Sequence, residues 1–154
     1  MHRIGGIEME EGTGNINYEP ENHELMTHIR ANKVAGIARD IPDLHVDRED
    51  DGAELLVLGW GSTWGPISEA VRWVRASGRT VDHAQLMHLN PFPTNLGEVL
   101  RSYRTVLIPE MNLGQLSRLV RAEFLVDAQS LTKVQGLAFS AGEIESRLVE
   151  MIDG

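Results

Sequence analysis

The second half of the chain alternates between strand-like and helix-like segments, and this alternation is the strongest constraint on its fold. From Ala53 onward, each apolar strand-like run is followed by a segment whose apolar residues recur at helical spacing. The strand-like runs are ELLVLGW, TVDHAQLMHL, RTVLIPE and EFLVDAQSL, and the helices are expected to begin near Pro66, Leu96, Leu113 and Ala141. Alternation of this kind predicts an α/β domain.

Two local signals support this division into elements. The run LLVL is apolar on both faces, which predicts a central, parallel strand. The three later helices each carry a capping-box pattern, in which a short polar residue is followed three places on by Glu or Gln. The boxes pair Asn95 with Glu98, Asn112 with Gln115 and Ser140 with Glu143.

The first part of the chain divides into a leading segment, residues 1–41, and an acidic segment, residues 42–52, before the α/β domain of residues 53–154. A helical pattern runs from about Glu21 to Ile41 and stops at Pro42. Its apolar face must be buried somewhere, so we expect it to pack on a partner or a neighbouring domain. Residues 42–52 carry five acids and one arginine, which predicts a linker or exposed loop.

Composition narrows the classes of function. The formal net charge of -9 argues against a protein whose main task is to bind nucleic acid. The absence of cysteine excludes a disulfide, a thiol nucleophile and an iron–sulfur cluster held by cysteines of this chain. The sequence shows no signal-peptide pattern and no apolar run approaching the roughly 18 residues of a membrane span. We therefore expect a cytoplasmic protein without a membrane partner.

The turn after the first strand-like run reads GWGSTWG, and a strand, a glycine-rich turn and a helix together cradle phosphates in many proteins. Gly59, Gly61 and Gly65 are spaced one residue longer than the dinucleotide fingerprint, and the turn lacks the Lys-Ser/Thr ending of a P-loop. Ser62 directly follows its glycine, unlike the nucleophile elbow of serine hydrolases. We expect a close-approach turn, with nucleotide binding and hydrolysis by Ser62 as weaker alternatives.

Other candidate sites carry less signal. Trp60 and Trp64 could stack on an adenine ring, although core or interface packing is the more frequent role of such a pair. His83 and His88 lie five apart on a strand-like run, so we expect them to face opposite sides. The acidic segment lacks the EF-hand pattern. No metal site is predicted.

Four stretches carry a family resemblance. In order, ELLVLGWGSTWGPISEAV, HLNPFPTNLGEVL, VLIPEMNLGQL and QSLTKVQGLAFSAGEIE resemble the C-terminal part of the alpha subunit of 2-oxoacid:ferredoxin oxidoreductases. The likeness is greatest to the 2-oxoglutarate (KorA-like) type, and the leading segment resembles the sequence just before that domain. The resemblance implies a transketolase C-terminal-domain-like fold: a three-layer, mostly parallel open sheet with helices on both faces.

The resemblance also implies an activity that needs parts missing from this chain. Complete enzymes of the family convert a 2-oxoacid to its acyl-CoA and reduce ferredoxin. Thiamine diphosphate lies between a separate domain of the alpha chain and the beta subunit, and the beta subunit supplies the magnesium motif and the cluster ligands. EDDGAELL does not match that motif. We therefore expect an inactive fragment that binds no cofactor alone, whose partners are the rest of the alpha subunit, the beta subunit, ferredoxin and coenzyme A.

The candidate site is the sheet edge where parallel strands end, because open α/β sheets bind ligands or partners there. Relatives often carry a basic residue at the position of Met87, which weakens a ligand site here. We expect an interface with the rest of the oxidoreductase, or a coenzyme contact. The alternative function is a free-standing coenzyme A- or nucleotide-binding module. The candidate residues are Gly59, Gly61, Ser62, Thr63, Asn90, Glu110, Asn112 and Gly114.

Overall fold

The computed structural model describes residues 9–49 and 52–154 of the chain. Within them, a five-stranded sheet has the spatial order β1-β3-β2-β4-β5. Strands β2 to β5 are parallel, and β1 runs antiparallel along the outer side of β3. The prediction that LLVL forms a central, parallel strand is confirmed. The strands are β1 (Val46–Asp47), β2 (Leu55–Trp60), β3 (Asp82–Leu86), β4 (Thr105–Glu110) and β5 (Ala128–Thr132).

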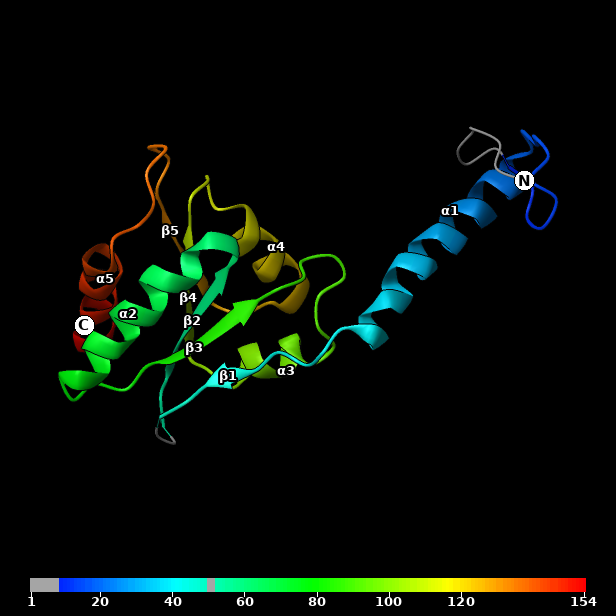
Figure 1. Ribbon diagram of the computed structural model, residues 1–154. Helices are drawn as coiled ribbons and strands as arrows, with labels where there is room; N and C mark the ends of the chain where they lie inside the picture. The colour runs from blue at the N-terminus through cyan, green and yellow to red at the C-terminus, as the bar shows by residue number, and fades with distance from the viewer. Residues whose placement is uncertain (1–8, 50–51) are drawn as a thin grey trace.

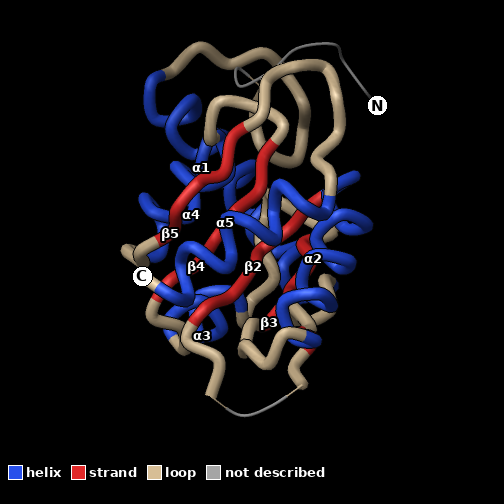
Figure 2. Tube along the Cα trace, turned by 90° about the vertical axis from the view of Figure 1, so that its left-hand side faces the viewer, coloured by secondary structure: helices blue, strands red, loops and turns tan. Residues whose placement is uncertain are grey.

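Helices cover both faces of the sheet (Figures 1 and 2). Helices α2 and α5 pack on one face, and α3 and α4 pack on the other. Because side chains alternate along a strand, Leu55 and Val57 enter the core under α2 and α5, whereas Leu56 and Leu58 enter the opposite core. This is the three-layer architecture that was predicted. The helices are α2 (Trp64–Ala76), α3 (Leu96–Arg101), α4 (Gln115–Phe124) and α5 (Ala141–Asp153).

The starts of the helices follow their local sequence closely. A 3₁₀ turn, Gly61–Thr63, leads into α2, so this helix begins slightly before Pro66, which fits in its first turn because the missing N–H is not needed there. At α5 the capping box is confirmed. The Ser140 hydroxyl accepts from the Glu143 amide at 3.3 Å, and the Glu143 carboxylate accepts from the Ser140 amide at 2.7 Å.

The other two predicted capping boxes need correction. Asn95 precedes α3 but makes no side-chain cap. Its amide instead accepts from the Leu44 N–H at 2.8 Å and donates to the Leu44 carbonyl at 3.0 Å. Asn112 accepts from the backbone amides of Gly114 and Gln115, both at 2.8 Å, but it lies two residues before the N-cap, Gly114, and so forms no capping box. The long-range bond to Leu44 could not be foreseen from local spacing.

Strand β5, predicted from the fourth strand-like run, starts later than that run indicated. Glu123 and Phe124 of the run EFLVDAQSL belong to the end of α4, and β5 begins at Ala128. Leu125 ends the helix in the left-handed conformation, with φ 55°, which is uncommon for a residue other than glycine.

The composition of the acidic segment predicted a linker or exposed loop, but part of this segment belongs to the sheet. Val46 and Asp47 form the edge strand β1, and Leu44 is buried in the core under α3 and α4. Arg75 of α2 holds this strand by donating to the Asp47 carbonyl at 2.8 Å and to the Asp47 carboxylate at 3.2 Å. The predicted exposed loop is therefore corrected to an edge strand at these two residues.

The predicted leading helix is confirmed as α1 (Pro20–Gly36), followed by a 3₁₀ turn, Ile37–Asp40. Figure 1 shows α1 projecting away from the sheet, with its own N-terminal end farthest from the sheet. No residue of α1 is buried. Its apolar side chains therefore have no core to enter within the described residues.

Candidate functional site at the carboxyl edge of the sheet

The parallel strands end at a common edge of the sheet. Trp60 at the end of β2 is in register with Leu86 at the end of β3, and Glu110 at the end of β4 with Thr132 at the end of β5. The connections that leave these ends carry most of the predicted site. The loops before α4 and α5 project together at one end of the molecule (Figures 1 and 2).

The glycines of the GWGSTWG turn have two different roles. Gly59 permits close packing, since a Cβ there would overlap the Gln85 side chain and lie 2.7 Å from Cδ1 of Ile67. Gly61 has φ +58° and nothing within 4 Å of the position of a Cβ, so its role is conformational. Thr63 closes the turn by accepting from the Trp60 amide at 3.2 Å and donating to the Trp60 carbonyl at 2.8 Å.

Ser62, Trp60 and Trp64 of this turn do not form a common site. Ser62 is exposed, and no described side chain hydrogen-bonds to it, so the turn offers no base to activate its hydroxyl. Trp60 packs against the core under α3 and α4, whereas Trp64 is 59% exposed. The two indoles therefore do not form one stacking surface.

Glu110, at the end of β4, serves the fold directly. Its side chain is fully buried, and its carboxylate accepts from the backbone amides of Leu116 at 2.7 Å and Ser117 at 3.1 Å. The Ser130 hydroxyl also donates to it at 3.1 Å. A carboxylate at the first turn of a helix satisfies free N–H groups and interacts favourably with the helix dipole. Glu110 thus anchors α4 and β5 to β4.

Asn112 and Gly114 complete the turn between β4 and α4. Asn112 fixes the turn before the helix through the two hydrogen bonds that it accepts from backbone amides. Gly114 has φ +82°, and a Cβ there would lie 3.2 Å from Oγ of Ser117 and 3.3 Å from Oγ of Ser130. These residues shape the loop that carries the exposed Met111 and Leu113.

Asn90 lies apart from the other predicted site residues. It is exposed and joined to Pro91 by a cis peptide bond. Together with Phe92 it lines a groove of about 800 Å³ between α1 and α4, which includes Val34 and Leu119. The structure therefore does not bring Asn90 together with the glycine turn.

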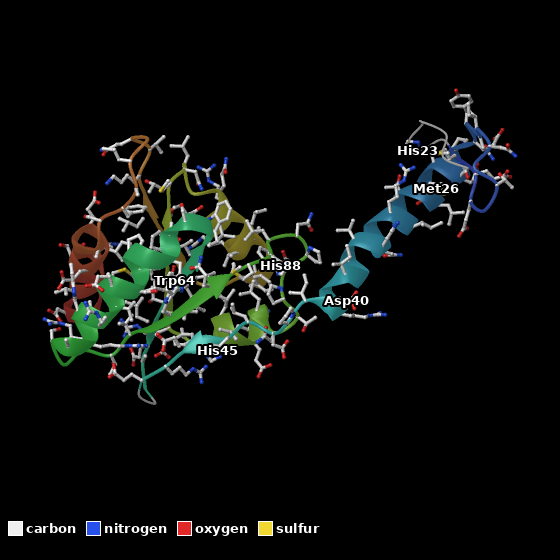
Figure 3. The ribbon with its side chains drawn as sticks, in the orientation of Figure 1. His23, Met26, Asp40, His45, Trp64 and His88 are labelled. Carbon is white, nitrogen blue, oxygen red and sulfur yellow. The ribbon has the colours of Figure 1, made fainter. Side chains whose placement is uncertain are left out.

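A separate cavity of about 290 Å³ opens over the face of β3 that α2 leaves uncovered. His83 and His88 both line it, so the prediction that they face opposite sides is wrong. Strand β3 ends at Leu86, and strict alternation does not reach His88. His45 and Trp64 line the same cavity, and Figure 3 shows these two with His88 around the uncovered face.

The deepest polar groups of this cavity come from β3. His83 is buried, and this burial lowers the pKa of its imidazole, although the neighbouring Gln85 amide acts in the opposite direction. Gln85 and His45 are absent from the residues predicted by sequence. Alternation along the predicted strand could have identified Gln85, because His83, Gln85 and Met87 lie two apart and so share one face of that run.

Exposed apolar side chains gather along the carboxyl edge. They lie at the start of α2, after β3, in the loop before α4 and in the loop before α5. Isolated exposed apolar residues are ordinary, whereas large contiguous patches of them are typical of interaction sites. We call this set the apolar edge; it comprises Trp64, Met87, Met111, Leu113, Val134 and Leu137.

Comparison with known proteins places this architecture in a family. Residues 53–144 match the family described as pyruvate:ferredoxin oxidoreductase core domain II. The chain belongs to this family. The 2-oxoglutarate oxidoreductase subunit KorA of Mycobacterium tuberculosis is 56% identical over 143 residues, which are 93% of this chain and 22% of that protein. The 2-oxoacid:ferredoxin oxidoreductase 2 subunit alpha of Aeropyrum pernix is 32% identical, over 97% of this chain and 24% of its own length.

A solved structure extends the likeness to α1 and the 3₁₀ turn after it, residues 20–40, which we call the arm. The 2-oxoglutarate:ferredoxin oxidoreductase from Magnetococcus marinus, solved with 2-oxoglutarate, coenzyme A and succinyl-CoA bound, matches with a TM-score of 0.88 and 33% identity. The match covers 99% of this chain, α1 included, and 27% of that chain. This member of the core domain II family thus spans about a quarter of the length of each of these three relatives.

The described residues offer no ligand set for a metal ion. They contain no cluster of three or more His, Asp or Glu side chains placed to hold a metal ion, and the sequence has no cysteine. No described helix has the length and apolar character needed to cross a membrane.

Proposed function

We propose that this chain is the assembly domain in the C-terminal part of the alpha subunit of a 2-oxoglutarate:ferredoxin oxidoreductase. The complete enzyme would use thiamine diphosphate, magnesium and an iron–sulfur cluster held elsewhere to convert 2-oxoglutarate to succinyl-CoA and to reduce ferredoxin. The chain itself supplies no catalytic residue. Family membership and the KorA likeness support this reading.

The apolar edge is the observation that carries the role in assembly. Its side chains project from four different connections, all at the carboxyl ends of parallel strands. Burying such side chains in a contact stabilises it by about 25 cal/mol per Å² of apolar surface removed from water. We therefore assign this edge to the contact with the rest of the oxidoreductase, namely the remaining alpha-chain domains and the beta subunit.

Charge substitutions at the tips of the edge test the proposal. Leu113 is 70% exposed and Leu137 is 64% exposed, so Asp at either position leaves the domain folded. In the complete alpha subunit, each Asp buried in the contact would be unpaired and would weaken association with the beta subunit. Gel filtration and 2-oxoglutarate-dependent reduction of a viologen dye should both show the loss. The isolated chain should show no dye reduction.

The matched control is Leu125→Asp. Leu125 is 89% exposed, lies at the end of α4 away from the carboxyl edge, and has the left-handed backbone that Asp tolerates. This variant should assemble and turn over like the native enzyme. If Leu113→Asp and Leu137→Asp also assemble normally, the apolar edge is not the interface. The cytoplasmic location and the use of ferredoxin are part of the same proposal.

A further inference from the structure

Strand β5 lies at the outer edge of the sheet and pairs with β4 along one side (Figure 2). The Asp127 carbonyl accepts a backbone hydrogen bond from β4 at 3.0 Å, and the Lys133 N–H donates one to β4 at 2.9 Å. Alternate residues of a strand direct their backbone groups to opposite sides. Ser130 and Thr132 therefore direct their backbone N–H and C=O groups away from β4.

The outward backbone groups of Ser130 and Thr132 form an open edge. Both residues are exposed, and no hydrogen bond from the described residues reaches these two N–H and two C=O groups. The edge is closed just before them, where the Arg121 guanidinium donates to the Ala128 carbonyl at 2.9 Å. The opposite edge of the sheet is covered by β1. An open edge strand is a template for pairing with another strand.

The free groups of β5 complement those of a second copy of the strand. Antiparallel pairing about a twofold axis at Leu131 places Ser130 of each copy opposite Thr132 of the other. Each of these pairs exchanges two backbone hydrogen bonds, so all four free groups of each copy are used. Ser and Thr side chains form favourable cross-strand pairs. The half-buried Leu131 gains contact with its own counterpart.

Charged side chains beside β5 favour the same partner. Arg147 of α5 donates to the Gln129 side chain at 3.1 Å, and Lys133 donates to the Glu143 carboxylate at 2.8 Å. A twofold axis at Leu131 places Gln129 of one copy opposite Lys133 of the other. Glu143 of each copy therefore comes beside Arg147 of the other copy. Opposite charges that meet in this way favour the pairing and fix its register.

We propose that β5 is the pairing edge for a second copy of this chain, which joins antiparallel about Leu131 to form one sheet through both copies. This contact goes beyond the assembly role and does not depend on it. Its residues lie on β5 and α5, outside the apolar edge, and it forms without the beta subunit. The isolated chain therefore tests the pairing separately from association with the rest of the oxidoreductase.

Light scattering of the 154-residue chain at rising concentration measures the pairing, and the mass should rise toward that of two chains. Thr132→Pro removes an outward N–H and leaves the bonds to β4 in place, so the variant should keep the native circular dichroism spectrum. It should pair at least about tenfold more weakly, because two of the four new hydrogen bonds are lost. Thr132→Val keeps the N–H and should pair like the native chain. A chain that stays monomeric, or a dimer unaffected by Thr132→Pro, would overturn the proposal.

Single cysteines test the register of the pair, because the sequence contains none. Residues directly opposite in a non-hydrogen-bonded antiparallel pair have Cα atoms about 4.5 Å apart, which is within the range of a disulfide. Leu131→Cys should therefore form a linked dimer on oxidation with diamide, seen on a non-reducing gel. Gln129→Cys is the control, because its counterpart lies four residues along the second strand, and it should stay unlinked. Failure of Leu131→Cys to link, or equal linking of Gln129→Cys, would contradict pairing about Leu131.

Discussion

At the scale of single residues, Glu110 is a buried carboxylate whose hydrogen bonds all serve the fold. It accepts from two amides of α4 and from the Ser130 hydroxyl. We expect Glu110→Gln to lower the free energy of unfolding by about 1–3 kcal/mol, because one acceptor oxygen becomes an NH₂ group that faces backbone donors. Urea denaturation of the chain measures the change.

The matched control for this substitution is Glu123→Gln, at an exposed position of α4. It should change the free energy of unfolding by no more than about 0.5 kcal/mol. Equal stability of the two variants would show that the carboxylate of Glu110 is not needed for the fold. A role in binding would then become the better explanation of its position at the carboxyl edge.

The stabilisation that Glu143 gives to the start of α5 depends on pH. Hydrogen bonds from Lys133, and then from the backbone and hydroxyl of Ser140, lower the pKa of Glu143 from 4.5 to about 2. A carboxyl whose folded pKa is depressed stabilises the fold above its unfolded pKa and loses this contribution as pH falls through the folded pKa. The urea midpoints of native chain and Glu143→Gln should therefore differ by a constant amount at neutral pH. The difference should shrink between pH 4.5 and about 2; a constant difference across this window would contradict the shift.

At the scale of elements, the sequence predicts well wherever local pattern and tertiary packing agree. Strand β2 and helices α2 and α5 were predicted within a few residues, because apolar periodicity, Pro66 and the Ser140 cap all act locally. Strand β1 was missed because it contains two residues in an acidic run and depends on Arg75, far along the chain. The run EFLVDAQSL could not be divided locally, since Phe124 at the end of α4 and Leu125 and Val126 before β5 are all apolar.

Arg75 therefore controls the stability of β1. Its guanidinium reaches the Asp47 carbonyl and carboxylate and also donates from Nε to the Val81 carbonyl at 3.0 Å. Arg75→Lys keeps the charge but cannot make these bonds together. Hydrogen exchange of the β1 amides should accelerate by on the order of tenfold, since each lost bond contributes about 1 kcal/mol. Arg72→Lys, at an exposed position of the same helix, is the control; equal acceleration in both variants would rule out the anchoring role.

The candidate site also has parts that the sequence predicted and parts that it did not. The glycine turn and the turn before α4 were predicted at the carboxyl edge because both follow predicted parallel strands. The structure adds that Gly61 acts through its positive φ and Gly59 through close approach, which a glycine in a sequence does not distinguish. The cavity was missed because it exists only where α2 leaves β3 uncovered. Its lining also joins His45, Trp64 and Gln85 from three separate segments.

At the scale of the whole molecule, the chain combines a sheet domain with two buried cores and an arm with none. Most of the stability of a helix in a protein comes from tertiary packing of its apolar face, and no residue of α1 is buried. Leu25, Val34 and Ile37 are exposed along the arm. The likeness to the Magnetococcus marinus enzyme includes this arm. We infer that α1 packs on another part of the oxidoreductase.

Amide hydrogen exchange tests the role of the arm in two states. In the isolated chain, the α1 amides should exchange rapidly, whereas those of Leu56 to Leu58, buried between two helical layers, should be protected to near the global free energy of unfolding. In the assembled oxidoreductase, the α1 amides should gain protection because their apolar face is covered. Val34→Asp should reduce that gain and leave the exchange of β2 unchanged. Protection of α1 equal to that of β2 in the isolated chain would mean that the arm is stable without a partner.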